Sequence, residues 1–265
     1  MSVLSFLTST ASNAVLSVTE TSSINTSINT LNSRLTSYFQ DQSITLRDKF
    51  KFGSSTRDTI LPRHMDEHSD IDYMIVFDSG YQPQTYLDRL SRFANFWYSS
   101  SEIYQSSPTI VLNLNHIKFE LVPAIRTYSW STNDYQIPNG SNWMNTNPND
   151  FNQQLITKNQ AHSYLIKPTI RLVKYWNAKS GYPFQSYLLE KWICGLTFYP
   201  CLFGNCNQKD YFFSVFDSLN EEWNDPLWKK EEIQRAKRII KNVRFYEDNN
   251  CPVSAEDELK KLFRL

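Results

Sequence analysis

Two aspartates stand two positions apart at the start of an apolar segment. The segment DIDYMIVF, residues 70–77, is rich in β-branched and aromatic residues and predicts a buried strand. Residues two apart in a strand point to the same face, so the carboxylates of Asp70 and Asp72 would lie side by side. Two such charges repel each other unless a cation lies between them. Mg²⁺ suits this arrangement, because it binds one or two carboxylates together with substrate phosphates.

A third acid, Glu120, stands on a later segment. Residues 108–125, PTIVLNLNHIKFELVPAI, form two alternating apolar runs separated by a turn-like Asn-His pair, which predicts a hairpin. Phe119 and Leu121 would point into the core, so Glu120 would lie on the opposite face, where it can meet the two aspartates. Three carboxylates on adjacent strands can hold two metal ions, the arrangement used for in-line phosphoryl or nucleotidyl transfer.

A Gly-Ser pair, Gly53 and Ser54, precedes the aspartates. A glycine lets the backbone approach a triphosphate, and exposed N–H groups with a hydroxyl can bind its oxygens. The pair does not belong to the G-x-x-x-x-G-K-[ST] phosphate loop, so a P-loop ATPase is not indicated. Gly-Ser and D-x-D are each common in proteins. Their order, followed by an acid on a later strand, is what makes the pattern specific.

Basic residues follow the Gly-Ser pair. Arg57 and Arg63 either contact phosphate or lie in a solvated loop, and the sequence leaves both alternatives open. His64 and His68 stand among acidic residues and are interpreted as surface residues.

The elements that must position these residues fall into two halves. Residues 129–150 are rich in Asn, Pro and Ser and predict a loop, and the chain beyond them carries apolar stripes near the helical period. We therefore predict a catalytic α+β domain over residues 1–150, with an N-terminal helix, and a helical lobe over residues 151–265. The apolar face of that N-terminal helix would be formed by Ile24, Ile28, Leu31, Leu35 and Phe39.

The order of the motifs resembles that of the DNA polymerase β superfamily of nucleotidyltransferases, and within it the cGAS/DncV-like nucleotidyltransferases (CD-NTases). This branch also includes the oligoadenylate synthases. Its pattern is a Gly-Ser turn, a D-x-D strand and a third acid on a neighbouring strand, here GSSTRDT, SDIDYMIVF and HIKFELVPA. The segment IKPTIRLVKYWN followed by SYLLE is similar to the helix-lysine and Ser-Tyr elements of the family. The resemblance spans roughly residues 45–195.

The resemblance implies a fold, a cofactor and a set of site residues. The fold is α+β: a polymerase β-like core, with a mixed sheet and flanking helices, followed by a C-terminal helical lobe that closes the active-site cleft. The cofactor is Mg²⁺ or Mn²⁺, two ions per active site. Two departures are Glu120 where the family usually has Asp, and Asp58 where it often has Gly. The implied residues are Asp70, Asp72 and Glu120 as catalytic metal ligands, Gly53 and Ser54 at the triphosphate, Lys174 and Ser186 at the donor triphosphate, and Tyr187 stacked on its base.

The resemblance also implies an activity. We expect a template-independent enzyme that joins nucleoside triphosphates into a cyclic or short linear oligonucleotide messenger and releases pyrophosphate. In bacterial antiphage (CBASS) signalling, such a product binds a downstream effector, so the effector would be reached through the product. An alternative is transfer of nucleotides to a tRNA end, or of AMP to a protein. A degenerate nucleotide-binding module is a third alternative, which the intact triad of acids disfavours.

Composition bears on the partners. Lys plus Arg and Asp plus Glu number 27 each, so the formal net charge is zero. Proteins that bind long nucleic acids usually carry a basic surplus, so we expect no extended DNA or RNA partner, whereas nucleoside triphosphates remain suitable substrates. No stretch approaches the roughly 18 apolar residues of a membrane span, and the N-terminal segment is a poor signal peptide. We expect a cytoplasmic monomer without membrane association.

Three cysteines cluster in the helical half. Cys194, Cys201 and Cys206, with His162 upstream, raise the question of structural zinc. Their spacing lacks the C-x-x-C knuckle typical of such sites. Buried reduced thiols are therefore the favoured interpretation.

Overall fold

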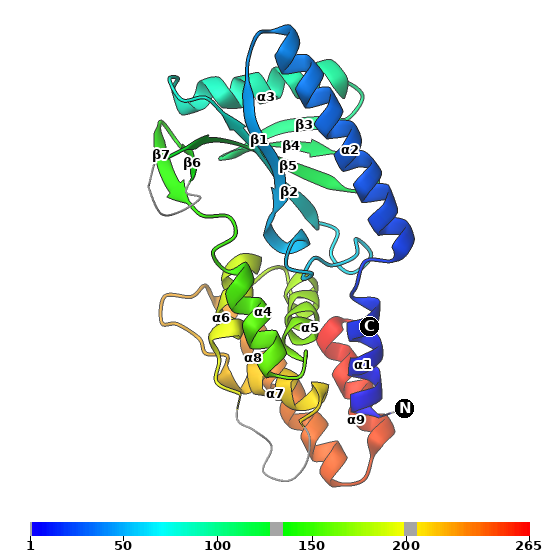
Figure 1. Cartoon of the computed structure of the whole chain (residues 1–265). Helices are drawn as coiled ribbons and strands as arrows, with labels where there is room; N and C mark the ends of the chain where they lie inside the picture. Colours follow the sequence, from blue (N-terminus) through cyan, green and yellow to red (C-terminus); the bar gives the residue numbers. More distant parts are fainter. Residues whose placement is uncertain (1, 128–134, 199–205) are drawn as a thin grey trace. The chain divides into compact units, whose positions relative to one another are not determined.

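The computed structural model describes residues 2–127, 135–198 and 206–265. The chain forms two compact units. The sheet unit contains residues 16–63 and 67–152, and the helical unit contains residues 1–15, 64–66 and 153–265. Each unit has its own core. The α+β fold class expected from the motifs, a mixed sheet with flanking helices and a helical C-terminal region, is confirmed (Figure 1).

A mixed sheet forms the centre of the sheet unit. Its strand order is β1-β2-β5-β4-β3, and β6 pairs with both β5 and β7. Strands β2 and β5 are parallel, while the other pairs are antiparallel. The parallel pair brings the aspartate segment beside the second run of the predicted hairpin, which is confirmed as β4–β5. The strands are β1 (Leu46–Phe52), β2 (Asp70–Phe77), β3 (Glu102–Ser106), β4 (Thr109–Asn113), β5 (Lys118–Arg126), β6 (Tyr135–Asn139) and β7 (Asn142–Thr146).

Two helices cover one face of the sheet. Helices α2 (Val18–Asp41) and α3 (Pro83–Trp97) pack on this face and enclose the main apolar core (Figure 1). Helix α2 begins with a capping box, in which Ser17 and Glu20 satisfy each other's free backbone N–H groups. The predicted apolar stripe of this helix is confirmed, and it is anchored by Phe39, whose ring lies 5.3 Å from that of Phe77. The other face of β2 and β5 carries a smaller apolar cluster and the candidate site.

The region predicted as a loop is only partly one. Within residues 129–150, strands β6 and β7 form a hairpin, so the loop prediction is wrong for residues 135–146. Asn139 pairs with Asn142, so Gly140 and Ser141 form the two-residue turn between the strands, and Gly140 has a φ of +61°, which suits such a turn. Residues 129–134 lie outside the described residues.

The helical unit is built around helix α5 (Ile166–Lys179). Helices α1 (Val3–Asn13), α6 (Ser186–Gly195) and α7 (Gln208–Ser218) contact it, and Trp176 at its centre is fully buried. Residues 1–15 were predicted to belong to the catalytic domain, but α1 packs against α5, α7 and α9 in the helical unit. The remaining helices are α4 (Asn152–Ala161), α8 (Leu227–Asp248) and α9 (Pro252–Lys260).

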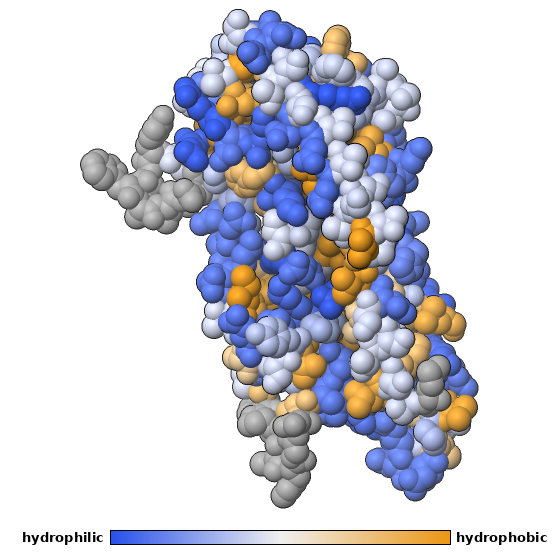
Figure 2. Space-filling model, turned by 45° about the vertical axis from the view of Figure 1, so that its right-hand side comes forward, coloured by the Kyte–Doolittle hydropathy of each residue, from blue (hydrophilic) through white to orange (hydrophobic). Residues whose placement is uncertain are grey.

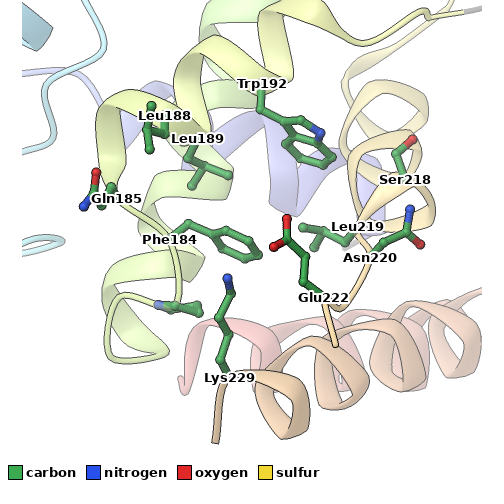
Figure 3. A pocket seen from close by; sticks show the side chains of 11 residues that line it. Phe184, Gln185, Leu188, Leu189, Trp192, Ser218, Leu219, Asn220, Glu222 and Lys229 are labelled. Atoms are coloured by element: carbon green, nitrogen blue, oxygen red, sulfur yellow. The ribbon is translucent and has the colours of Figure 1, made fainter. Parts of the chain in front are cut away.

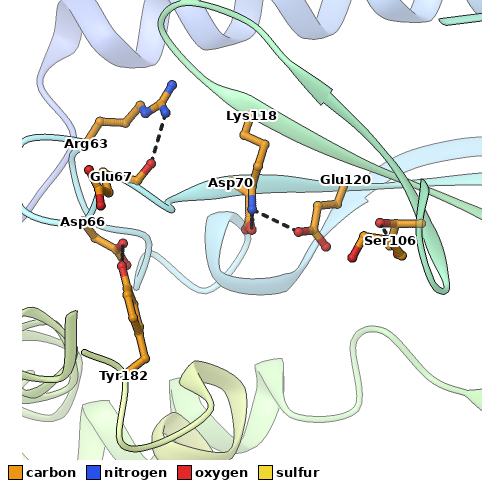
Figure 4. Close-up of polar contacts among 9 residues, drawn as sticks. Arg63, Asp66, Glu67, Asp70, Ser106, Lys118, Glu120 and Tyr182 are labelled. Carbon is orange, nitrogen blue, oxygen red and sulfur yellow. Dashed lines mark hydrogen bonds and ion pairs between the residues drawn. The ribbon is translucent and has the colours of Figure 1, made fainter. Parts of the chain in front are cut away.

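The short segment 64–66 also belongs to the helical unit. There the hydroxyl of Tyr182 donates a hydrogen bond to the carboxylate of Asp66, 2.5 Å away (Figure 4).

The surface in the view of Figure 2 is mostly hydrophilic, with hydrophobic residues in small scattered groups. Among the described residues, no helix combines the length and the apolar character needed to cross a membrane.

Candidate active site

Strands β2 and β5 bring four charged residues together on one face of the sheet. Asp70 is the register partner of Lys118, and Asp72 is the partner of Glu120. Register partners in a parallel pair share a face, as do residues two apart on one strand. The predicted meeting of Glu120 with the aspartates is therefore present in the structure. Lys118, the fourth member, was not predicted as a site residue.

The ammonium of Lys118 lies between two of the acids. Its Nζ is 3.0 Å from Oδ2 of Asp70 and 3.1 Å from Oε1 of Glu120 (Figure 4). The side chain of Lys118 is 18% exposed, and those of Asp70 and Glu120 are each 27% exposed. The residue alternation in HIKFEL gives the signal that was missed, because it places Lys118 on the same face as Glu120.

The site strongly perturbs the protonation of Asp70. Burial, followed by the nearby charge of Glu120, raises the pKa of Asp70 to about 6, although Lys118 opposes the shift. Burial also lowers the pKa of Lys118, but the charges of Asp70 and Glu120 outweigh it, so this pKa lies above its ordinary value. The carboxylates of Asp70 and Glu120 are therefore held at close range in a partly desolvated place.

The Gly-Ser turn lies against the second aspartate. Gly53 begins a short 3₁₀ turn, η1 (Gly53–Ser55), at the end of β1, with a φ of +71°. A Cβ placed on Gly53 would stand 1.8 Å from Oδ2 of Asp72, so only glycine fits. Ser54 follows as a half-buried residue, and its carbonyl accepts hydrogen bonds from the N–H groups of Arg57 and Thr59. The backbone of the predicted triphosphate turn therefore directly adjoins the acids.

The structure explains one departure from the family pattern. Asp58, where the family often has glycine, has a φ of +58°, a left-handed conformation that glycine adopts most easily and that Asp tolerates better than most residues.

Arg57 is 5% exposed, and its guanidinium lies 5.5 Å from the ring centre of Phe151, so the solvated-loop alternative is wrong for this residue. Arg63 is half-buried and donates to the carbonyls of Leu114 and Glu67. His64 and His68 are exposed, as predicted.

The predicted donor-nucleotide residues lie in the helical unit. Lys174, predicted at the donor triphosphate, is 5% exposed, and its Nζ donates to Oε1 of the fully buried Glu190, 2.7 Å away. Ser186 is the first residue of α6, and Tyr187 follows it with 42% of its surface exposed. The ammonium of Lys191 lies 5.8 Å from the ring centre of Tyr187. Tyr187 is therefore partly exposed, whereas Lys174 already has a buried anionic partner.

A cavity of about 440 Å³ lies elsewhere in the helical unit (Figure 3). Its walls come from the start of α6, the end of α7 and the start of α8, and include Phe184, Trp192, Leu219 and Lys229. The ammonium of Lys229 lies 4.6 Å from the ring centre of Phe184. None of the predicted donor residues lines this cavity.

The cysteines do not form a zinc site among the described residues. Cys194 is a buried free thiol, as predicted, whereas Cys206 is in a disulfide, so the reduced-thiol interpretation is wrong for Cys206. Cys201 lies outside the described residues.

The chemistry of the three acids fits a divalent cation. The residues supply hard oxygen ligands, and two of them, Asp70 and Glu120, already share one cationic group in the structure. As they stand, no three His, Cys, Asp or Glu side chains in the described part of the chain are gathered to hold an ion. At this site the positive charge between Asp70 and Glu120 is the ammonium of Lys118.

Comparison with known proteins places this site in a family. Residues 1–159 match the family described as Second Messenger Oligonucleotide or Dinucleotide Synthetase domain (SMODS). A protein of Bacillus cereus (strain VD146) named "Probable cyclic nucleotide synthase" is 34% identical over 98 residues. That match spans 35% of this chain and only 30% of the length of the relative.

Solved structures share the fold. CdnC of E. coli MS115-1, in a complex with HORMA-deltaN, superposes with a TM-score of 0.67 at 14% identity, covering 94% of this chain and 93% of that one. The CD-NTase CdnG of Bradyrhizobium diazoefficiens, in complex with GTP, has a TM-score of 0.66 at 10% identity, covering 97% and 96%. E. coli DncV, bound to 3′-deoxy GTP, has a TM-score of 0.61 at 11% identity, covering 82% and 69%.

The sequence match to the family extends over more than half of the chain. The fold similarity extends over nearly all of it. The protein is therefore a member of the Second Messenger Oligonucleotide or Dinucleotide Synthetase domain family, which confirms the resemblance to CD-NTases seen in its motifs.

Proposed function

We propose that this protein is a template-independent nucleotidyltransferase that makes a cyclic or short linear oligonucleotide messenger from nucleoside triphosphates. One observation carries the proposal: Asp72 and Glu120 are register partners on β2 and β5, with Asp70 on the same face and the Gly53 turn against Asp72. This arrangement joins an acidic cation site to a turn suited to phosphate. The family match and the name of the Bacillus cereus relative support the same activity.

The three acids have separate tasks in this proposal. Asp70, Asp72 and Glu120 would hold Mg²⁺ or Mn²⁺, two ions per site, and such ions would neutralise the triphosphate and activate the attacking hydroxyl. Glu120 would ligate the ion that activates the attacking hydroxyl and would help to take its proton. The hydroxyl oxygen forms a bond to the α-phosphorus as the bond to the β-phosphate oxygen breaks, and pyrophosphate leaves.

Other residues bind the donor nucleotide. The backbone of Gly53 and Ser54 would contact the triphosphate, because the turn directly adjoins Asp72. Ser186 opens α6, where free N–H groups and the helix dipole favour an anion. Tyr187 would stack on the base, and Lys174 would contribute positive charge near the donor triphosphate.

The proposed role is bacterial antiphage (CBASS) signalling by a cytoplasmic monomer. The product, rather than the enzyme, would contact the effector. The sheet unit would provide the catalytic core, and the helical unit would supply residues that bind the donor nucleotide. Solved relatives with ATP and with GTP support nucleoside triphosphates as substrates. No extended nucleic-acid partner is expected, because the net charge is zero.

The proposal is tested with the double variant Asp70→Asn, Asp72→Asn. Wild-type protein incubated with four nucleoside triphosphates and Mg²⁺ or Mn²⁺ should form a phosphatase-resistant product without any macromolecular acceptor. The double variant should form none, with an unchanged far-UV circular dichroism spectrum. Normal incorporation by the folded double variant would refute the role of the acids. Label that passes only to an added tRNA or protein would instead support the alternative function.

A further inference from the structure

Lys118 lies inside the segment HIKFELVPA, but it was not predicted as a site residue. We propose that Lys118 is an internal counter-cation: it holds Asp70 and Glu120 in place before a metal binds, and a divalent cation must displace it. The inference rests on the proposed function, because it concerns the metal site of that function.

The contacts support this role. The same ammonium is within 3.1 Å of both carboxylates, and it comes from the position on β5 directly beside Asp70 in the strand register. Figure 4 shows the Lys118 side chain directed at the two acids. A cation placed between Asp70 and Glu120 would meet this ammonium at close range, and like charges in a partly buried place repel strongly. The two cations therefore compete for the same carboxylates.

A neighbouring strand offers an acceptor for the displaced ammonium. Asn113 on β4 is the register partner of Lys118. Its Nδ2 donates to Oε2 of Glu102, 3.0 Å away, while its Oδ1 is buried and has no hydrogen-bond partner among the described residues. Directly opposed residues of antiparallel strands have Cβ atoms about 5 Å apart. An ammonium that leaves the acids thus has an unused carbonyl oxygen beside it.

The test measures binding of Mn²⁺ alone, without nucleotide, by isothermal titration calorimetry. Lys118→Met should bind Mn²⁺ at least tenfold more tightly than wild type, because the competing charge is removed. Lys118→Arg retains the charge and should stay within about threefold of wild type. Lys51→Met is the matched control, because it removes one charge from an exposed lysine on the neighbouring strand β1, and it should leave the Kd unchanged.

The melting temperature gives a second readout of Mn²⁺ binding, and it can be used even if Lys118→Met is less stable than wild type. Without metal, Lys118→Met should melt at a lower temperature than wild type, because Asp70 and Glu120 lose the charge between them. Mn²⁺ should raise its melting temperature by more than it raises that of wild type. An equal or smaller rise, or an unchanged or weaker Kd for Mn²⁺, would overturn the inference.

Asp72→Asn separates this inference from the proposed function. If Asp72→Asn weakens Mn²⁺ binding while Lys118→Met binds like wild type, the metal site stands and the counter-cation role is wrong. If wild type, Asp72→Asn and Lys118→Met all bind Mn²⁺ equally weakly, the metal site itself is wrong, and the inference fails with it.

Discussion

The carboxylate of Asp72 fills the space that a side chain at Gly53 would need. A Cβ on Gly53 would stand 1.8 Å from Oδ2 of Asp72, and the φ of Gly53 is +71°. A side chain at Gly53 would therefore move the Asp72 carboxylate, so the turn at the end of β1 helps to fix the position of the acid on β2. This relationship connects the two motifs that the sequence shows separately, the Gly-Ser pair and the D-x-D strand.

Gly53→Ala should abolish most activity. The new methyl group must displace the Asp72 carboxylate, and a misplacement of about 1 Å at a catalytic group can lower the rate about a hundredfold. The left-handed backbone adds strain of roughly 1–2 kcal/mol. Gly140→Ala is the control, because Gly140 has a φ of +61° but open space around its Cβ position. Gly140→Ala should lose about as much stability as Gly53→Ala and keep its activity. If Gly53→Ala keeps activity within twofold of wild type, the contact between Gly53 and Asp72 does not matter for catalysis.

Glu120→Gln should bind nucleoside triphosphate but fail at the chemical step. Asp70 and Asp72 remain to bind the incoming nucleotide with its metal, whereas the acceptor side loses its charged oxygen. We expect kcat to fall at least a hundredfold, about 3 kcal/mol in activation free energy, with the Kd for a non-hydrolysable triphosphate within about threefold. Glu120→Asp, which restores the usual acid of the family, should retain more activity. Turnover of Glu120→Gln within twofold of wild type would make Glu120 a structural residue.

The stability of the metal-free protein should depend on Asp70 and pH. The pKa of Asp70 is raised to about 6 in the folded protein, from a value of 3.8 when unfolded, chiefly by burial. The folded state therefore binds this proton more tightly, and the associated stability, complete below pH 3.8, is lost as pH rises through about 6. Asp70→Asn should gain in melting temperature relative to wild type by a few degrees between pH 4 and pH 7. If the gain in melting temperature instead shrinks as the pH rises over this range, the pKa of Asp70 is lowered, not raised, in the folded protein.

Lys174→Met should unfold more easily than wild type. Removing one partner of a buried ion pair costs about 3–5 kcal/mol, because the other charge stays buried and loses its counter-charge. Here that charge is Glu190, which is fully buried. The double variant Lys174→Met, Glu190→Gln should recover most of the loss in chemical denaturation. If this double variant also binds a non-hydrolysable triphosphate like wild type, Lys174 is purely structural; a Kd several-fold weaker supports its proposed place near the donor.

Tyr187→Ala should weaken all nucleoside triphosphates alike. A stacked base contributes about 1–3 kcal/mol, and stacking does not depend on which base is present. Tyr187→Phe keeps the ring and should bind like wild type. Tyr164→Ala, which removes another exposed tyrosine of the helical unit, should have no effect. Equal titration curves for Tyr187→Ala and wild type would place the base elsewhere.

Local patterns predicted the parts of the site that depend on strand alternation. The order of Phe119, Glu120 and Leu121 was enough to place the acid on the face away from the core, and the structure agrees. The same alternation also places Lys118 on that face. Its contact with Asp70, however, depends on the parallel register of β2 and β5, a pairing of distant segments that no local pattern specifies.

Burial of charged groups was harder to predict. The helical pattern around Lys174 does not indicate whether its side chain is buried or exposed. Its burial follows from the ion pair with Glu190, which lies on another helix. The hairpin of β6 and β7 was missed for a different reason. Its polar strands lack apolar alternation, and only the turn residues Gly140 and Ser141 marked it.

Mass spectrometry of the nucleotide product tests the central claim most directly. Purified wild-type protein, four nucleoside triphosphates and Mg²⁺ or Mn²⁺ are incubated without RNA or protein acceptor, treated with phosphatase and examined for new species. The proposed function predicts an oligonucleotide that resists phosphatase, with pyrophosphate released in proportion, and neither from the Asp70→Asn, Asp72→Asn protein. Recovery of nucleosides alone from wild type, while labelled nucleotide is transferred to an added tRNA or protein, would contradict it.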